Sequence, residues 1–531
     1  MQTDVQLYDT TLRDGAQREG ISFSVEDKIK ITKKLDELGI HLIEGGWPGS
    51  SPKDTEFFSQ ARDIALSNST LVAFGSTRHA HTNVENDSNI HGLVNANFGI
   101  VTLVGKGSAE QVTNVLKIDR DENLAMIEDS VRYLKSKGIT VFFDAEHFFD
   151  GYKKDPEYAF RTIEVAADGG ADCLVLCDTN GGTMPGEVSA IVDRVKNRVN
   201  SPLGIHAHND MELAVANTLA AVQAGVSQVQ GTINGYGERC GNANLCSIIP
   251  TLKLKMGIDC VRSEQLAKLT DVSHYVSEIA NLALDSHLPY VGASAFGHKG
   301  GMHIAAMTRA EDSYQHIDPS LVGNSNRFVV SELSGVNTIT HKAREMGLDL
   351  AAGNAQTRQI LKQLKDLENQ GFKYDDADAS FNLMLHRAQP HYTSPFELVD
   401  FMVVVENNRR LPTINDGEML CEAMVKVRIS QNVYHTAAEG NGPVNALDKA
   451  LRKALIQFYP KLSVIKLTDY KVRILEETEG TEAKVRVLIE STDGEREWHT
   501  VGASTNIIEA SWIALADSME YWLLQNTKTE S

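Results

Sequence analysis

The feature that most constrains the fold of this chain is a regular alternation of short apolar runs with amphipathic segments between residues 5 and 240. The segment 25–38 is typical of a helix, because Ser24 and Asp27 form a capping-box pattern at its start and Gly39 closes it. Similar helical patterns lie at 123–137 and 214–224. The apolar runs, each expected to form a strand, are 5–9, 42–46, 71–76, 100–104, 140–146, 173–179, 202–208 and 228–234.

Eight strands that alternate with helices predict an α/β fold, a (β/α)8 TIM barrel with a parallel sheet. A doubly wound open sheet is the alternative. It usually has fewer strands in this length and a glycine-rich dinucleotide-binding turn after its first strand, and no such turn follows residues 5–9. We therefore expect the barrel, with its chemistry at the carboxyl ends of the strands.

Polar residues follow the expected strands at these ends. They are Arg13 and Asp14 after the first strand, Glu44 on the second, Arg78 after the third, Glu146 on the fifth, Asp178 and Thr179 on the sixth, His206 and His208 on the seventh, and residues 235–242 after the eighth. Chemistry-bearing side chains are thus expected to gather at one pole of the barrel.

His206 and His208 are two residues apart, a spacing that puts both side chains on one face of a strand. Alone, they would be explained equally well as a core pair, and Arg13 with Asp14 as a surface ion pair. Together, Asp14 and the two histidines form a two-histidine, one-carboxylate set that can bind a divalent metal, to which Asn242 could add an oxygen. Such a metal suits the carbonyl of a 2-keto acid, with Arg13 stabilising the alkoxide that forms.

A carbon nucleophile would also need a base and an acid, for which Glu146 and His303 are candidates. His303 closes the stretch 295–303, which has two histidines and a lysine around a glycine pair, and an ordinary loop is the alternative for it. Helical patterns dominate from about 245 to 390, at 264–284, 342–348 and 356–369. The acidic run 374–378 is expected to be an exposed connector.

The tail from about Ser394 repeats itself. Residues 422–428 recur as 482–487, 434–436 recur as 498–500, and a helix near Asn445 recurs near Asn506. Two units of strands followed by a helix predict a duplicated α+β domain with a pseudo-twofold axis and a ligand cleft between the halves. It lacks convergent catalytic residues, so regulation or dimerisation is expected of it.

Length and charge limit the remaining possibilities. A chain of 531 residues predicts two or three domains. A net charge of −20 without a basic face argues against nucleic acid or an anionic membrane as partner. No apolar run approaches the length of a membrane span, and the first residues lack a signal-peptide pattern, so a cytoplasmic protein is expected. The six cysteines are expected to be reduced thiols.

Taken together, the motifs resemble those of the alpha-isopropylmalate, homocitrate and citramalate synthases, which condense acetyl-CoA with a 2-keto acid on a metal-binding barrel. The likeness runs nearly from end to end, tail included. The residues that carry it are 9–17, 43–48, 177–182, 206–210, 237–243 and 295–299.

The resemblance implies a site for a divalent ion (Mn, Mg or Zn) whose ligands are Asp14, His206, His208 and Asn242. It also implies small-molecule substrates, with acetyl-CoA as co-substrate. The residues expected to bind substrate are Arg13, Asp14, Asp144 and Thr179.

By the same resemblance Glu146 is an acid, and His303 with Tyr314 activates the acetyl methyl group. These two residues would reach the barrel of a partner subunit, which implies a homodimer with an active site completed across subunits. The expected domains are a catalytic barrel at 1–275, helical subdomains carrying the catalytic His and Tyr at 276–392, and an allosteric regulatory and dimerisation domain at 393–531.

The form of residues 44–50 and the chain length are most similar to the longer citramalate synthases, whose keto acid is pyruvate. The expected product is then (R)-citramalate on the route to isoleucine, with isoleucine as the effector. Where relatives commonly carry Ser-x-Glu-Asp, this chain has Asp-Ala-Glu-His at residues 144–147. The difference keeps the acid Glu146 but changes the shape of the pocket, and so affects which keto acid it accepts.

Three alternatives remain beside this hypothesis. One is 2-isopropylmalate synthesis from 2-oxoisovalerate. Another is a lyase of the hydroxymethylglutaryl-CoA type, for which Cys240 would be the loop cysteine, although the residues around it match the synthases better. An amino-acid sensor on an inactive barrel would require a broken metal set, and this set is intact.

Overall fold

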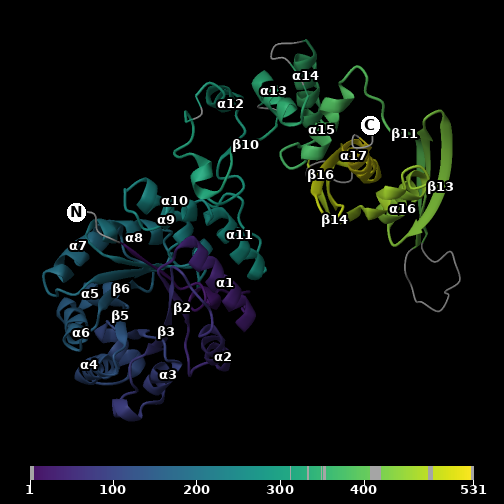
Figure 1. Ribbon diagram of the computed structural model, residues 1–531. Helices are drawn as coiled ribbons and strands as arrows, with labels where there is room; N and C mark the ends of the chain where they lie inside the picture. Colours follow the sequence, from purple (N-terminus) through teal and green to yellow (C-terminus); the bar gives the residue numbers. More distant parts are fainter. Residues whose placement is uncertain are drawn as a thin grey trace, which may run out of the picture. The chain divides into compact units, whose positions relative to one another are not determined.

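The computed structural model describes residues 5–310, 312–331, 334–348, 350, 355–406, 420–475 and 482–527. The chain forms two compact units. The first comprises residues 1–296 and 316–326 and contains a barrel, and the second comprises 297–315 and 327–531 and contains the repeated tail (Figure 1).

Eight parallel strands close into a barrel in chain order, and β8 pairs with β1 from Gln6 opposite Gln228 to Asp9 opposite Gly231. This confirms the predicted (β/α)8 fold. The strands are β1 (Gln6–Asp9), β2 (Leu42–Gly46), β3 (Thr70–Ser76), β4 (Ile100–Lys106), β5 (Thr140–Glu146), β6 (Cys173–Asp178), β7 (Leu203–Ala207) and β8 (Gln228–Gly231).

Helices surround the barrel on its outside (Figure 1). In α1 the predicted capping box is present, with Asp27 donating its backbone N–H to the Ser24 hydroxyl, and Gly39 ends the helix at a φ of 88°. The helices of this unit are α1 (Val25–Leu38), α2 (Pro52–Ala61), α3 (Ser88–Ala96), α4 (Arg120–Ser136), α5 (Phe148–Lys154), α6 (Pro156–Asp168), α7 (Pro185–Lys196), α8 (Ala214–Gln223), α9 (Leu245–Leu254), α10 (Ser263–Leu266) and α11 (Leu269–Ile279). Shorter helical turns are η1 (Gly15–Gln17), η2 (Val84–Asn86), η3 (Gln111–Leu116), η4 (Ile233–Gly235) and η5 (Pro319–Val322).

The barrel has an apolar core on both sides of its sheet. The larger part lies between strands and helices, and a smaller cluster that includes Tyr8, Val72, Phe142 and Val175 comes from the opposite strand faces. Cys173 and Cys177 belong to the smaller cluster, and all six cysteines are free thiols, as predicted. In the part of the chain that the structure describes, no helix has the length and hydropathy needed to cross a membrane.

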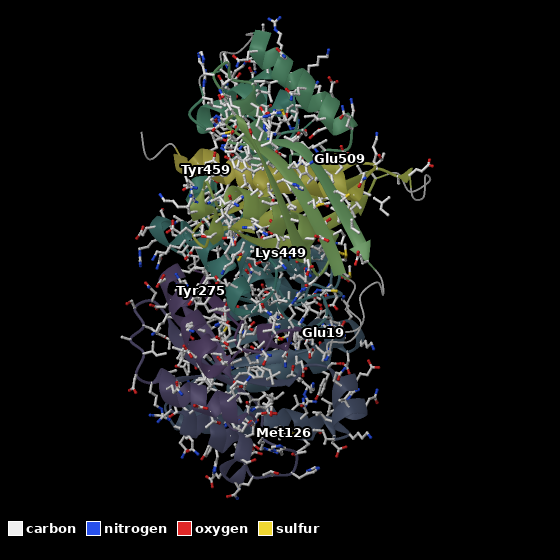
Figure 2. All side chains as sticks on the ribbon, turned by 90° about the vertical axis from the view of Figure 1, so that its right-hand side faces the viewer. Glu19, Met126, Tyr275, Lys449, Tyr459 and Glu509 are labelled. Atoms are coloured by element: carbon white, nitrogen blue, oxygen red, sulfur yellow. The ribbon has the colours of Figure 1, made fainter. Side chains whose placement is uncertain are left out.

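The single helix predicted at 264–284 is wrong: the chain forms α10 and α11 with a break between them. Gln265 of α10 packs on the turn after α1, where a Cβ on Gly39 would come within 2.5 Å of its amide. The chain then turns before α11 packs along α1, where the Lys34 ammonium lies 5.1 Å from the ring centroid of Tyr275. Tyr275 is labelled in Figure 2. Asn281, at a φ of 53°, lies just beyond the end of α11.

The second unit begins with short elements. Strands β9 (Gly297–His298) and β10 (Arg327–Phe328) pair in parallel, and the helices are α12 (Gly301–Met307), α13 (Val336–Glu345), α14 (Ala355–Asn369) and α15 (Asp378–Arg387). The helix expected at 342–348 thus begins and ends earlier. The run 374–378 is not an exposed connector, because Tyr374 is only 4 % exposed and packs in the cluster with Phe381 and Leu385.

The tail is duplicated as predicted. Each half has three antiparallel strands and a helix, and the elements are β11 (Glu397–Glu406), β12 (Leu420–Ile429), β13 (Asn432–Gly440), α16 (Pro443–Leu455), η6 (Pro460–Val464), β14 (Lys466–Ile474), β15 (Val485–Thr492), β16 (Glu497–Ser504) and α17 (Ile507–Thr527). In both halves a threonine hydroxyl of the third strand donates to a helix carbonyl 14 residues later, from Thr436 to Ala450 and from Thr500 to Ala514, at 2.8 Å each.

One part of the predicted repeat is out of register. Val425 lies opposite Thr436, and in the second half Ile489 lies opposite Thr500. Ile489 is therefore the structural counterpart of Val425. The repeat in the sequence, which matches 422–428 with 482–487, pairs Val425 with Val485 instead. Because this shift is an even number of residues, the same face of the strand stays buried.

The helix before the tail is joined to the second half by a cluster of charges. On α17, Asp517 and Glu520 are 6 % and 4 % exposed, and both accept hydrogen bonds from Arg387 of α15, at 2.8 and 2.7 Å. Ser380 of α15 also donates to Asp517, at 2.7 Å. Helix α15 therefore packs as part of the repeated tail.

Candidate active site

The loop after β1 is held to the segment that follows the neighbouring strand β8. The buried carboxylate of Asp9 accepts hydrogen bonds from the Thr11 backbone N–H and hydroxyl, at 2.9 and 2.8 Å, and the Thr11 hydroxyl accepts one from the Ile233 N–H at 2.9 Å. Burial raises the pKa of Asp9 to about 7. These contacts fix the backbone that presents Arg13 and Asp14 to the pole of the barrel.

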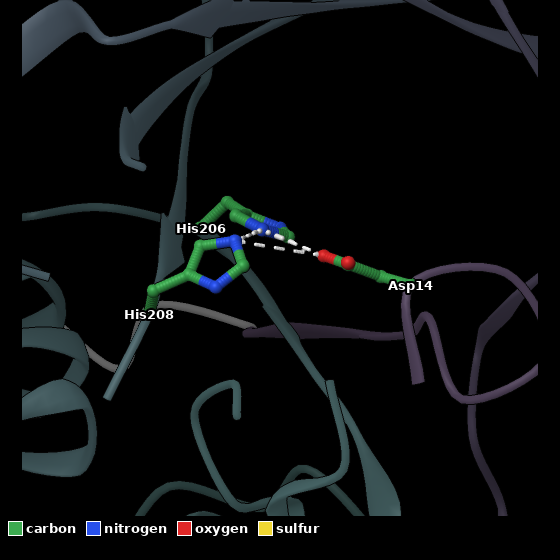
Figure 3. A group of neighbouring side chains, drawn as sticks. All are labelled: Asp14, His206 and His208. Atoms are coloured by element: carbon green, nitrogen blue, oxygen red, sulfur yellow. Dashed lines mark hydrogen bonds and ion pairs between the residues drawn. The ribbon is translucent and has the colours of Figure 1, made fainter. Parts of the chain in front are cut away.

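Asp14 lies with His206 and His208 at this pole (Figure 3). Its Oδ2 atom is 3.2 Å from His206 Nε2 and 3.7 Å from His208 Nε2, and the two Nε2 atoms are 3.4 Å apart. Ligand atoms of the three buried residues lie within 4.8 Å of one another. This arrangement fits a divalent cation bound by two imidazoles and one carboxylate.

The charges of the cluster also favour a cation. Burial acts to raise the pKa of Asp14, but the Arg13 guanidinium and the two imidazoles outweigh it and hold the pKa well below its usual range. Burial lowers the pKa of His208 to about 4, with a further contribution from His206, so this ring is neutral and can act as a ligand at pH 7. For His206, contact with Asp14 outweighs burial and raises the pKa, so positive charge is stabilised at Nε2.

Gln230 of β8 orients the His206 ring. The Nδ1–H of His206 donates to Gln230 Oε1 at 2.9 Å, which leaves Nε2 to face Asp14. The Gln230 amide group donates to Asp144 Oδ1 at 3.1 Å and to Gln228 Oε1 at 3.4 Å, so the orientation of the amide is set by two acceptors. Such outer partners of metal-binding histidines fix the ring and its tautomer.

Asn242 reaches the same cluster. Its Nδ2 donates to Asp14 Oδ2 at 2.8 Å and lies 3.3 Å from His206 Nε2, while its buried Oδ1 has no hydrogen-bond partner among the described residues. A 180° rotation of the amide exchanges the two atoms and brings this oxygen toward Asp14 and His206. The residue is thus placed to add an oxygen ligand.

Arg13 is held from two sides. Its Nε donates to Glu44 Oε1 at 2.5 Å, and its guanidinium lies 3.9 Å from the centre of the Phe74 ring. Glu44 is fully buried and also accepts from the Tyr8 hydroxyl at 2.6 Å. With Nε engaged by Glu44, the terminal nitrogens of the guanidinium point to the cavity beside Asp14.

The other predicted residues lie at the ends of β5 and β6. Burial, followed by the charge of Glu44, raises the pKa of Asp144 to about 7. Glu146 forms an ion pair with Lys106. Thr179 accepts the His147 N–H at 2.8 Å through its hydroxyl oxygen, so its O–H is free to donate to a ligand.

These groups line a cavity of about 260 Å³ at the pole of the barrel, of a size for a small carboxylic acid. The lining residues are Arg13, Asp14, Gln17, Trp47, Phe74, Val104, Asp144, Glu146, Cys177, Thr179, His206, His208, Glu238 and Arg239. All the predicted metal and substrate residues of the barrel except Asn242 belong to this lining, and Asn242 contacts Asp14 directly.

His303 and Tyr314 belong to the second unit. Their rings stack with centroids 4.1 Å apart, and the ring centroids of His298 and His303 are 6.4 Å apart. Tyr314 is 48 % exposed. The stretch 295–303 is therefore not only a loop, since β9 and the start of α12 arise within it and place His303 on the first turn of the helix.

Sequence reasoning missed Gln230, Trp47 and Phe74, and it named Glu44 without a role. A detectable signal existed for Gln230, because two glutamines two residues apart, Gln228 and Gln230, interrupt an apolar strand and must both face the barrel interior. The roles of Trp47 and Phe74 depend on contacts between strands that a single sequence does not reveal.

Three family descriptions match the chain. "HMGL-like" covers residues 4–276, "Homocitrate synthase post-HMGL domain-like" covers 290–371, and "LeuA allosteric (dimerisation) domain" covers 376–523. Similarity to individual curated proteins extends over the same length.

The chain is 52 % identical over 526 residues to an (R)-citramalate synthase of Geobacter sulfurreducens and 50 % identical over 527 residues to one of Aquifex aeolicus, with 99 % of each chain covered in both comparisons. A 2-isopropylmalate synthase of Methanocaldococcus jannaschii is 30 % identical over 528 residues, covering 99 % of this chain and 96 % of that protein. The motifs, the barrel and these relatives agree, and the chain belongs to the family of the (R)-citramalate synthases.

Proposed function

We propose that the protein condenses acetyl-CoA with pyruvate to give (R)-citramalate and CoA, the step that commits carbon to isoleucine. The observation that carries this proposal is the cluster of Asp14, His206 and His208 beside Arg13, in a chain related over its whole length to (R)-citramalate synthases. The reaction forms one carbon–carbon bond, which needs an electrophilic carbonyl and a methyl carbon that has lost a proton. It also breaks the thioester bond with one water molecule, which releases CoA and the free carboxylate.

Asp14, His206, His208 and Asn242 are proposed to hold a divalent ion, Mn, Mg or Zn. When bound, such an ion polarises the carbonyl of the keto acid as a Lewis acid. The protein's part is to orient the two imidazoles, which Gln230 does for His206 through the bond to Nδ1. Arg13, whose Nη1 lies 3.8 Å from Asp14 Oδ1, stabilises the negative charge that develops on the keto oxygen.

The carboxylate of the keto acid is proposed to bind Thr179 and Arg13. The Thr179 O–H is free to donate, because its oxygen already accepts the His147 N–H. Asp144, whose pKa is raised to about 7 by burial, is proposed to contact the substrate from the floor of the same cavity. A partly protonated carboxyl there can donate a hydrogen bond and does not repel an anion as a carboxylate would.

Glu146 is proposed as an acid, and His303 with Tyr314 as the pair that removes a proton from the acetyl methyl group. The stacked rings of His303 and Tyr314 support a shared role. Glu146 lies in the cavity of the metal cluster. We propose a homodimer in which His303 and Tyr314 complete the site of the partner subunit. The proposed domains are 1–275, 276–392 and 393–531.

The duplicated tail is proposed to dimerise and to bind isoleucine. Its match to the "LeuA allosteric (dimerisation) domain" and its two equivalent halves support this role. A coupling free energy of about 1–3 kcal/mol to the active site would give roughly 5- to 150-fold inhibition.

The test is release of CoA from acetyl-CoA by the metal-loaded protein with pyruvate, 2-oxobutyrate and 2-oxoisovalerate in turn. We expect pyruvate to have the highest kcat/KM and isoleucine to inhibit. A preference for 2-oxoisovalerate with inhibition by leucine would assign 2-isopropylmalate synthesis instead. Cleavage of hydroxymethylglutaryl-CoA without any condensation would assign the lyase.

A further inference from the structure

The cavity of about 260 Å³ that Asp14, His206 and His208 line (the metal cavity) has a neighbour in the barrel unit. This second cavity has a volume of about 370 Å³, and three residues, Trp47, Val104 and Glu146, line both cavities. Its remaining lining includes the apolar side chains Leu116, Ile118 and Met126, the last of which is labelled in Figure 2. The three side chains that line both cavities therefore lie between them, and the indole of Trp47 is the largest of the three.

From this geometry we infer that Trp47 determines which keto acid the site accepts, by closing the metal cavity against the second one. The inference rests on the proposed function. In the metal cavity the charged and polar lining is occupied by the carbonyl and carboxylate of a keto acid, so its alkyl group must face the apolar lining. The apolar side chains of that lining are Trp47, Phe74, Val104 and Cys177.

Trp47 is held rigidly, as a partition must be. Its backbone N–H donates to Asp54 Oδ2 at 2.9 Å and its indole N–H donates to Asn89 Oδ1 at 2.8 Å. The Asn89 amide in turn donates to the Ser76 hydroxyl at 2.8 Å. The indole is therefore fixed at the ring and at the backbone, to α3 and to α2.

The indole also supports the substrate-binding arginine. Trp47 meets Phe74 edge to face, with ring centroids 5.5 Å apart and an interplanar angle of 81°. Arg13 lies over the same Phe74 ring at 3.9 Å. Phe74 thus packs against both Trp47, which limits the alkyl chain, and Arg13, which binds the carboxylate end. The distance between Trp47 and Arg13 therefore limits the length of the keto acid.

The backbone conformation before Trp47 supports this placement. Gly46 has a φ of 142°, and a Cβ there would lie 2.5 Å from the Asp54 carboxylate. Asp54 also pairs with Lys28, whose ammonium donates to the Gly45 carbonyl at 2.9 Å. The loop that carries the indole is thus anchored to α1 and α2 and does not move easily to admit a longer chain.

The test compares wild-type protein with Trp47→Ala and Trp47→Phe. Trp47→Ala joins the two cavities, whereas Trp47→Phe keeps a smaller aromatic side chain between them and loses the bond to Asn89. One extra methylene in a fitted apolar pocket changes kcat/KM by about 10- to 200-fold. We expect Trp47→Ala to lower the preference for pyruvate over 2-oxobutyrate and over 2-oxoisovalerate by at least about tenfold, and Trp47→Phe to keep most of it.

Binding is measured as well, because Trp47→Ala could disturb turnover. Calorimetric titration of the metal-loaded variants with 2-oxoisovalerate needs no acetyl-CoA, and metal content with a thermal melt shows that each variant is folded. A gain of affinity for 2-oxoisovalerate in Trp47→Ala supports the inference even when turnover is low. A folded Trp47→Ala protein whose affinity for 2-oxoisovalerate relative to pyruvate equals that of wild type would overturn it. Wild-type protein that is inactive on pyruvate would refute the proposed function instead.

Discussion

Replacing Gln230 with leucine tests how the site holds its metal. Leucine is of similar size, but it offers no acceptor to His206 Nδ1 and no donor to Asp144, which are 2.9 and 3.1 Å from the glutamine amide. His206 can then rotate or take the tautomer that has a proton on Nε2. Loss of an outer partner typically lowers metal affinity by about 10- to 100-fold, which corresponds to about 1.4–2.7 kcal/mol of binding free energy.

The assay is titration of metal-free protein with Mn²⁺, followed by the electron paramagnetic resonance of the free ion. Gln228→Leu is the matched control, because Gln228 is also buried and contacts Gln230 at 3.4 Å, and its own amide bonds to Gln6 at 3.1 Å. It should leave Mn²⁺ affinity within about threefold of wild type, since Asp144 still orients Gln230. Gln230→Glu keeps the acceptor and should retain Mn²⁺ binding. Equal affinities of wild type and Gln230→Leu, or an equal loss in both leucine variants, would refute this reasoning.

Three further predictions concern the metal, the base and pH. Asp14→Asn and His208→Ala are each expected to abolish turnover and to resist rescue at ordinary metal concentrations, and metal analysis beside the activity assay checks this. His303→Ala is expected to lower kcat by about 100-fold or more with little change in keto-acid affinity; a mutant that keeps its kcat and binds keto acid weakly would make His303 a substrate contact. Asp9 has a folded pKa of about 7, raised by burial above its ordinary value of about 3.9, so it binds a proton on folding. Stability should therefore fall as pH rises from about 4 to about 7, and Asp9→Asn should flatten this dependence; parallel pH profiles of the two melting temperatures would contradict it.

The barrel could be predicted from sequence because its signals are local. All eight strands were expected at nearly their observed positions, since each apolar run is bounded by turn residues or helix caps. The metal cluster followed from two residue spacings and one rule of topology, that chemistry gathers at the carboxyl ends of barrel strands. Asp14 and the two histidines are indeed neighbours in the structure.

What could not be predicted depends on contacts between distant elements. The two glutamines of β8 indicate that both side chains face the barrel interior, but they do not indicate that the Gln230 amide contacts a histidine on the neighbouring strand. The register of the tail was misassigned because the alternating pattern matches equally well after a shift of an even number of residues, and only strand pairing selects Ile489. Tyr374 was expected to be exposed because four neighbouring charges obscured the one side chain that packs inward.

The ion pairs between Arg387 of α15 and the two carboxylates of α17 bear on how the proposed inhibition by isoleucine could be removed. Deleting the tail from about residue 394 would remove Asp517 and Glu520 and leave Arg387 without its two carboxylates. The Arg387 side chain is 43 % exposed and would become solvated, but truncation would also break the Ser380–Asp517 hydrogen bond and uncover the α15 side chains that pack on the tail. The tail is thus not a detachable module, and a desensitised protein is better sought through substitutions in the repeats than through truncation.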